Sequence, residues 1–217
     1  MSAPSRRDIL RGLGRLGLGL LTPPLAAAVA EASEVPAARE RLLGHPRSRF
    51  PLLLFATPAP APRLDGALRD AVDEWNQVFR ETFGVAAFLG HDREDTAQVI
   101  VRFAPPDASG RLMGETRLDA DERGVLRLPV HVTLHQPVAR GQTPAERLLF
   151  QIAAHELGHA LGLPHQNQPA SLMCCDRGAL DFEDARVRET YIAARRQPSV
   201  RSVVAQLTAH YRRLWGP

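Results

Sequence analysis

The chain contains no lysine, and all 27 of its basic residues are arginine. We interpret this as the coding bias of a GC-rich genome. Near the N-terminus Arg6, Arg7, Arg11 and Arg15 are opposed only by Asp8, a net charge of +3 that equals the net charge of the whole chain. The remaining residues therefore carry 23 arginines and 23 acidic residues. Because no excess of positive charge remains, we expect no nucleic-acid partner.

The chain also lacks a long uninterrupted apolar run. Residues 12–21 are mildly apolar, but Arg15 interrupts them, whereas a membrane-spanning helix needs about 20 apolar residues. The stretch from Ser5 to Arg11 resembles a twin-arginine export signal, and Ala28 to Ala30 supply the small residues that a signal peptidase reads. We therefore expect residues 1–30 to be an export signal. The alternatives are an amphipathic helix and a retained membrane anchor.

A length of 217 residues, 44% of them hydrophobic, is sufficient for one globular domain and a leader. After removal of the leader we expect the chain in the periplasm or outside a bacterial cell, with no stable membrane insertion. Residues 31–49 are rich in alanine, glutamate, arginine and proline, and we interpret them as a linker or a short pro-segment. Residues 50–217 then form the domain. The sequence contains no internal repeat and leaves the oligomeric state open.

Three histidines lie in the pattern His155-Glu156-x-x-His159-x-x-Gly162-x-x-His165. His155 and His159 are four residues apart, so on a helix both imidazole rings project from the same face. Gly162 can adopt the left-handed conformation that ends a helix, which would let His165 return toward the other two rings. Three nitrogen ligands leave one position of a tetrahedral metal open for water, as in a catalytic zinc site. Glu156 is the candidate to handle that water's proton.

The residues around this pattern predict the helix that it requires. Thr143 and Glu146 have the spacing of a capping box, with Pro144 at the first helical position. Apolar residues recur at helical spacing, namely Leu148, Leu149, Ile152 and Leu161. We therefore predict a helix from about Pro144 to Leu161, closed by Gly162.

The extended histidine pattern resembles the zinc motif of the metzincin metallopeptidases. Ser171-Leu172-Met173 resembles their Met-turn, in which a methionine lies beneath the metal. Met173 comes eight residues after His165, the short spacing of the matrixin (matrix-metalloproteinase-like) branch.

The resemblance implies a fold, a cofactor and an activity. The fold is α+β: a metzincin-like zincin domain with a twisted mixed sheet, an edge strand bordering the cleft, a long helix on the sheet, an active-site helix and a small C-terminal helical part. The cofactor is one catalytic Zn²⁺ bound by His155, His159 and His165. The activity is that of a zinc-dependent endopeptidase, which hydrolyses polypeptides by metal-activated water with Glu156 as general base.

Sequence patterns elsewhere agree with such a fold. Strands are expected at residues 50–55, 85–89, 98–103 and 124–135, and helices at 64–83, 181–196 and 199–215. From Leu126 to His135 the strand at 124–135 alternates between apolar and other residues. Because Pro129 has no N–H to donate to a neighbour, we predict that this is an edge strand. In matrixins the strand at this point pairs with an extended peptide, so the resemblance implies substrate contacts at Pro129, Val130 and His131.

Further metal sites are weaker candidates. His131 and His135 lie on one face of the predicted strand and are a candidate second site, although solvated histidines are the more common case. Asp119, Asp121 and Glu122 are a candidate Ca²⁺ site. Because the spacing of an EF-hand loop is missing, we expect an ordinary acidic turn there.

The chain has two cysteines, Cys174 and Cys175, directly after the methionine of the motif. An oxidising compartment favours a disulfide, but adjacent residues do not reach ordinary disulfide geometry without strain. A vicinal disulfide, two free thiols and links to another chain are all left open, as is a thiolate that reaches the metal. The family commonly has an aromatic residue and a proline here, so the lining of the substrate pocket is expected to differ.

The alternative to an enzyme is a catalytically silent, zinc-containing peptide-binding module. A damaged general base would indicate it, and Glu156 is intact. Hydrolysis of a non-peptide amide is a third hypothesis.

Overall fold

The computed structural model describes residues 42–108, 112–137, 143–176 and 178–216. The expected export signal at residues 1–30 and most of the expected linker lie outside the described residues. In chain order the elements are η1 (Arg47–Arg49), β1 (Leu52–Ala56), α1 (Pro62–Phe83), β2 (Phe88–Gly90), η2 (Glu94–Thr96), β3 (Val99–Ala104), β4 (Gly114–Arg117), β5 (Val130–His135), α2 (Ala145–Ala160), α3 (Ala185–Arg196), η3 (Val200–Val203) and α4 (Val204–Trp215).

Five strands form one mixed sheet in the order β2-β1-β3-β5-β4. β1 pairs in parallel with β2 and with β3, and β3 pairs in parallel with β5. β4 runs antiparallel to β5 and forms one edge of the sheet. The predicted α+β fold with a mixed sheet is confirmed.

The strand predicted at residues 124–135 is shorter than expected and is not an edge strand. β5 begins at Val130 and is paired on both sides, with β3 and with β4. Pro129 precedes the first paired residue, and the N–H of Val130 donates to the Gln98 carbonyl at 2.9 Å. Pro129 therefore lies just outside the strand, and its missing N–H does not indicate whether β5 is an edge strand. The expected substrate contacts at Pro129, Val130 and His131 thus lose the free edge on which they depended.

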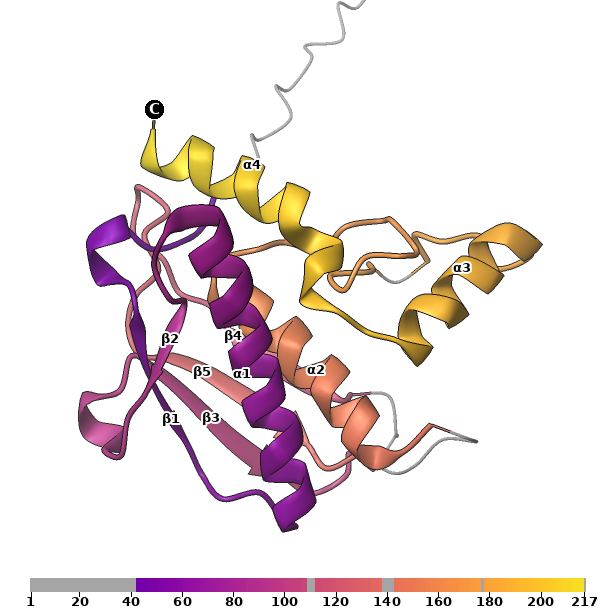
Figure 1. Cartoon of the computed structure of the whole chain (residues 1–217), viewed down its shortest axis with the longest axis horizontal. Coiled ribbons are helices and arrows are strands. Elements are labelled where there is room, and N and C mark those ends of the chain that lie inside the picture. Colours follow the sequence, from indigo (N-terminus) through magenta and orange to yellow (C-terminus); the bar gives the residue numbers. More distant parts are fainter. Residues whose placement is uncertain (1–41, 109–111, 138–142, 177, 217) are drawn as a thin grey trace, which may run out of the picture. The chain divides into compact units, whose positions relative to one another are not determined.

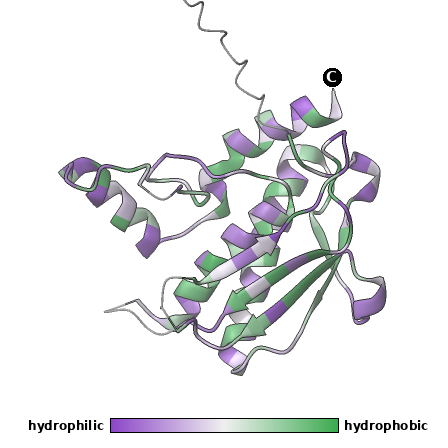
Figure 2. Cartoon of the chain, turned by 180° about the vertical axis from the view of Figure 1, so that it is seen from behind, coloured by the Kyte–Doolittle hydropathy of each residue, from purple (hydrophilic) through white to green (hydrophobic). Residues whose placement is uncertain are grey.

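Helices α1 and α2 cover the same face of the sheet (Figure 1). Trp75 of α1 is fully buried, and its Nε1 donates to the Ala154 carbonyl of α2 at 2.9 Å. Gly84 ends α1 with a φ of 76°, which glycine adopts without a steric penalty. Figure 2 shows the central strands coloured mainly as hydrophobic, as expected for strands that are covered by helices. The core of the domain therefore lies between the sheet and these two helices.

Two helices follow the histidine motif. The helix predicted at 181–196 begins at Ala185, where the Asp184 Oδ1 accepts the backbone N–H of Arg186 at 2.8 Å. α3 contains no buried residue and stands apart from the sheet, whereas α4 lies beside α1 (Figure 1). None of the described helices combines the length and the hydropathy needed to cross a lipid bilayer.

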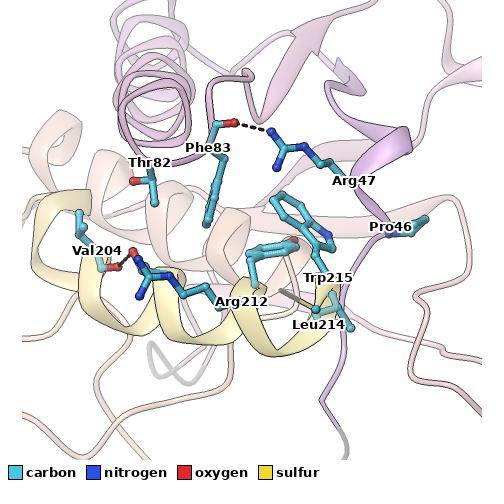
Figure 3. A pocket seen from close by; sticks show the side chains of 11 residues that line it. Pro46, Arg47, Thr82, Phe83, Val204, Arg212, Leu214 and Trp215 are labelled. Atoms are coloured by element: carbon cyan, nitrogen blue, oxygen red, sulfur yellow. Dashed lines mark hydrogen bonds between the residues drawn. The ribbon is translucent and has the colours of Figure 1, made fainter.

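Residues 42–46, called here the N-terminal strap, belong to the domain although the boundary was expected at Phe50. The strap residue Gly44 accepts the N–H of Leu126 at 2.9 Å. The Leu43 carbonyl accepts from the His210 Nε2 of α4 at 2.7 Å. The strap is therefore fixed to the loop before β5 and to α4. A hollow of about 740 Å³ lies beside it, between the end of α1 and α4, and contains none of the three motif histidines (Figure 3).

His45 of the strap makes the stability of the domain depend on pH. Its ring is fully buried, and its Nε2 donates to the Ala160 carbonyl at 2.9 Å, while its Nδ1 has no partner among the described residues. Burial lowers the pKa of His45 to about 4 from its ordinary value of 6.5. Between these values the unfolded chain binds a proton that the folded chain does not, so stability falls as the pH falls.

We therefore expect this group to lower the free energy of unfolding by about 2 kcal/mol between about pH 7 and about pH 4.5. Urea unfolding of the wild type and of His45→Gln at both pH values measures it, with both proteins in the same metal state. The loss on acidification should be smaller in the variant, because glutamine does not titrate. An equal loss in the two proteins would contradict the assignment to His45.

Candidate metal centre

Helix α2 carries two of the three histidines and ends where the motif predicts. Its last residue is Ala160, and Gly162 follows with a φ of 88°. A Cβ at Gly162 would overlap with the Leu43 carbonyl of the strap, so both the conformation and the packing require glycine here. The first turn differs from the prediction: no side chain caps it, so the capping box of Thr143 and Glu146 is wrong. Glu146 instead forms an ion pair with a neighbouring arginine on α1.

The Nε2 atoms of the three motif histidines converge on one point. His155 Nε2 lies 3.1 Å from His159 Nε2 and 3.2 Å from His165 Nε2, and the last two are 3.1 Å apart. Nitrogens bound tetrahedrally to zinc at about 2.0–2.1 Å are about 3.3 Å from one another. Among the described residues, His155, His159 and His165 form a group whose ring nitrogens lie close enough together to hold one metal ion. Their spacing therefore fits a single zinc-sized ion.

The opposite ring nitrogens fix the tautomer of these histidines. His155 Nδ1 lies 2.8 Å from the Leu172 carbonyl, and His159 Nδ1 lies 2.8 Å from the Leu163 carbonyl. A carbonyl only accepts hydrogen bonds, so each Nδ1 is the protonated nitrogen and each Nε2 presents a lone pair. His165 Nδ1 has an acidic partner, the Asp176 Oδ1 at 3.0 Å. The motif did not predict Asp176, which is one of several acidic residues after the Met-turn.

Burial keeps the two helical histidines neutral. It lowers the pKa of His155 to about 3, with the neighbouring His159 as a further cause, and it lowers the pKa of His159 to about 4. A neutral imidazole is the form that binds a metal, so at neutral pH no proton has to be displaced from these rings.

Glu156 is buried beside the histidines and is held by the edge strand β4. Thr116 Oγ1 lies 2.6 Å from the Glu156 Oε2 and 3.0 Å from the Glu156 carbonyl. A Cβ at Gly114 would lie 2.7 Å from the Glu156 Oε1, so the carboxyl group also packs against the backbone of β4. Burial raises the pKa of Glu156, and the hydrogen bond from Thr116 opposes that rise. Sequence reasoning missed this strand, because Gly114 to Arg117 show no hydrophobic alternation.

Met173 lies fully buried under the helix that carries the histidines. Its sulfur would be only 2.5 Å from a Cβ at Gly158, which is between His155 and His159 in α2. The structure thus places the methionine of the expected Met-turn directly against the motif helix.

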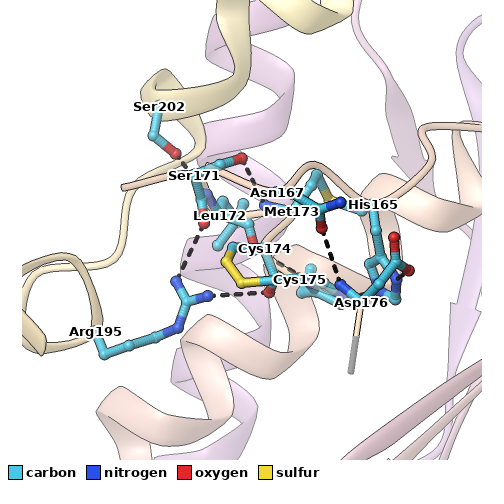
Figure 4. Close-up of a disulfide and its surroundings, with 11 residues drawn as sticks. His165, Asn167, Ser171, Leu172, Met173, Cys174, Cys175, Asp176, Arg195 and Ser202 are labelled. Atoms are coloured by element: carbon cyan, nitrogen blue, oxygen red, sulfur yellow. Dashed lines mark hydrogen bonds and ion pairs between the residues drawn. A yellow bond between two sulfur atoms is a disulfide. The ribbon is translucent and has the colours of Figure 1, made fainter. Parts of the chain in front are cut away.

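Cys174 and Cys175 form a disulfide, one of the arrangements that the sequence left open (Figure 4). No free thiol is then present at these positions to reach a metal. Both cysteines line a cavity of about 280 Å³ beside the histidines. The other residues around it are Leu112, Met113, Gly114, Gln151, Ile152, His155, Glu156, His165, Tyr191 and Arg195.

The weaker metal candidates are not brought together. Among the described residues neither His131 nor His135 joins a metal-binding group. His135 Nδ1 donates to the Pro105 carbonyl at 2.8 Å, and His131 is exposed. Asp121 accepts the backbone N–H groups of Arg123 and Val125, as in an ordinary acidic turn.

The family model described as matrixin matches residues 56–186, more than half of the chain. Matrix metalloproteinase-16 of Rattus norvegicus is 32% identical over 133 residues, which cover 52% of this chain and 20% of that protein, and the Homo sapiens protein matches equally. Stromelysin-2 of Rattus norvegicus is 27% identical over 143 residues, covering 57% and 25%. The chain thus matches a quarter or less of the length of these relatives.

Two solved structures resemble the fold distantly. Archaemetzincin from Methanopyrus kandleri has a TM-score of 0.41 at 13% identity, with 74% of this chain and 94% of that chain covered. Myroilysin has a TM-score of 0.32 at 16% identity, with 74% and 58% covered.

Proposed function

Because the chain belongs to the matrixin family, we propose that it is a zinc-dependent endopeptidase. One observation carries the proposal beyond the family: three Nε2 lone pairs converge within 3.2 Å of one another beside a buried carboxyl group. Three unprotonated nitrogens do not remain so close without a shared cation, because their lone pairs repel. His155, His159 and His165 are the proposed zinc ligands.

Each residue of the site has a separate part in the proposed hydrolysis. A bound zinc ion supplies a Lewis acid that polarises the scissile carbonyl and lowers the pKa of water. Glu156 accepts the proton of the attacking water and transfers it to the leaving amine. Thr116 holds one oxygen of that carboxyl group, at 2.6 Å, and so leaves the other free for the proton. Leu172, Leu163 and Asp176 orient the three imidazole rings through Nδ1. No side chain forms a covalent bond to the substrate in this scheme.

The edge strand β4 supports a polypeptide as the substrate. β4 pairs with β5 along one side, and no other described strand pairs with its second side. Gly114 of this strand lines the cavity that contains the histidines. An extended peptide can add to such an edge through its backbone, which would carry the scissile bond past the metal centre. β4 thereby takes the role that the sequence had assigned to residues 129–131.

The alternative is a zinc-containing peptide-binding module without turnover. An intact and buried Glu156, which lines the same cavity as His155 and His165, favours the enzyme. The N-terminal pattern supports export as a further part of the proposal, with residues 1–30 removed.

Removal of the metal is expected to abolish peptide cleavage, and addition of zinc to restore it. Purified protein should contain about one zinc per chain, since three histidines form one site. The measurement is metal analysis of the protein, paired with digestion of casein and of a mixed peptide library before and after chelation. Cleavage that persists in the metal-free protein would refute the proposal. A full zinc site without any cleavage would favour the silent binding module.

A further inference from the structure

Arg195 of α3 is held rigidly at the wall of the cavity. Its Nη1 donates to the Ser171 carbonyl at 3.2 Å and its Nη2 donates to the Cys174 carbonyl at 3.0 Å. Its Cζ lies 4.5 Å from the centre of the Tyr191 ring. Figure 4 shows the guanidinium directed at the segment that contains Met173 and the disulfide. Two hydrogen bonds and a stacked ring therefore fix the orientation of this cation before any ligand binds.

The charge of Arg195 has no carboxylate partner in the described part of the chain. The ion pairs found there join other residues. Two backbone carbonyls use two of the five N–H donors of a guanidinium and supply only partial negative charge. The side chain is half-buried, so water compensates its charge less than on an open surface. Arg195 is thus an oriented cation with unused donors.

The cavity gives this cation access to whatever lies beside the histidines. Arg195 and Tyr191 line the same space of about 280 Å³ as His155, Glu156 and His165. Among the described residues that line this cavity, Glu156 is the one carboxylate, and its side chain is engaged by Thr116 of β4. Apart from Arg195, the other lining residues that the structure describes are uncharged or are histidines. A negative group that entered this space from a ligand would therefore meet an unmatched arginine.

We propose that Arg195 is a specificity-determining residue that selects substrates with an acidic side chain next to the scissile bond. This inference rests on the proposed peptidase function and adds a substrate class to it. An aspartate or glutamate side chain accepts charge-assisted hydrogen bonds from the free N–H groups of Arg195. A neutral glutamine of the same shape makes weaker hydrogen bonds with Arg195. The apolar residues that line the cavity offer no hydrogen bonds to either side chain. The expected preference therefore depends on the charge of the substrate side chain and not on its size.

The experiment uses zinc-loaded full chain and quenched fluorogenic peptides that differ at one position. One pair of peptides has Glu or Gln directly after the scissile bond, and a second pair has the same exchange directly before it. For one of the two pairs, the wild type is expected to show a kcat/KM about tenfold higher for Glu than for Gln. Raising the salt concentration from about 0.05 M to about 0.5 M should reduce this ratio, because salt screens the attraction.

Substitutions at position 195 test whether Arg195 causes the preference for Glu over Gln. Arg195→Met keeps the aliphatic stem and should cleave Glu and Gln peptides at equal rates, whereas Arg195→Lys should retain part of the preference. Arg196→Met is the matched control, because Arg196 is the next residue of α3 and is exposed; it should keep the wild-type ratio. If Arg195→Met does not fold, the lysine variant and the salt dependence of the wild type decide the question.

Equal rates for Glu and Gln peptides in the wild type, at both positions, would overturn the inference and leave the peptidase function standing. Absence of all cleavage by zinc-loaded protein would instead contradict the proposed function. In that case fluorescence anisotropy with the same peptides tests the role of Arg195 in binding. About tenfold tighter binding of a Glu peptide than of a Gln peptide, lost in Arg195→Met, supports that role. Equal binding of the Glu and Gln peptides rejects it.

Discussion

The Glu156→Gln variant is expected to cleave peptides about 10³-fold more slowly than the wild type while it binds the same amount of zinc. Glutamine has the shape of glutamate and can still accept the hydrogen bond from Thr116, but its amide does not take up the proton of the attacking water. The three histidines and their Nδ1 partners are unchanged, so the metal should remain. Zinc analysis and kcat/KM on one fluorogenic peptide measure the two effects.

Glu146→Gln is the control for this experiment, because Glu146 is on the same helix but in its first turn, ion-paired with Arg63. It should have wild-type activity, since exposed ion pairs contribute only about 0–1 kcal/mol to stability. Near-normal cleavage by Glu156→Gln would refute its role as general base. Loss of zinc together with activity would indicate that Glu156 maintains the site and does not act on the proton.

The Gly158→Ala variant is expected to destabilise the domain by about 2 kcal/mol and to weaken zinc binding, because the added methyl group overpacks the core under the motif. The new Cβ would lie 2.5 Å from the sulfur of Met173 and 3.2 Å from Cζ2 of Trp75. Both of these side chains are fully buried, so neither can move into solvent. The displacement falls on the helix between His155 and His159. Urea unfolding and a zinc titration of the metal-free protein measure the two changes.

The same substitution at Gly66 should act in the opposite direction. Gly66 lies in α1, and the nearest atom to an added Cβ is the end of the Arg69 side chain at 3.9 Å. Replacing glycine by alanine within a helix then stabilises by about 0.5–1 kcal/mol. The pair thus separates helix propensity from packing. A gain in stability in both variants would mean that Met173 does not press on the helix as described.

The histidine spacing predicted the most important part of the site because it is a local property. Residues four apart on a helix share a face whatever the rest of the fold does, and a glycine after the helix lets the chain turn back. His155, His159 and His165 were therefore named from the sequence, and so was the end of their helix near Gly162. The long helix before Gly84 rests on the same kind of periodic signal, whereas the α+β class was implied by the resemblance to the metzincins.

Features that depend on distant contacts were not predictable in this way. The sequence from Gly114 to Arg117 has no apolar alternation, and each of its residues pairs with a residue at least 14 positions further along the chain, the nearest pair being Arg117 and His131. β4 was therefore missed, and with it Thr116 and the true edge of the sheet. The capping box failed because the helix begins one residue later than expected, so that Pro144, which has no side-chain acceptor, takes the N-cap position. Asp176 has no sequence feature that distinguishes it from the other acidic residues of its region, and its contact with the His165 ring depends on the fold.

The N-terminal strap limits how this protein can mature. A processing protease that cut at the expected boundary near Phe50 would remove the residues that accept the His210 hydrogen bond and donate to Ala160 at the end of the motif helix. It would also uncover Gly162, whose position is packed against the Leu43 carbonyl. Any trimming compatible with an intact motif helix therefore has to stop before Leu43, and the same limit applies to recombinant truncations.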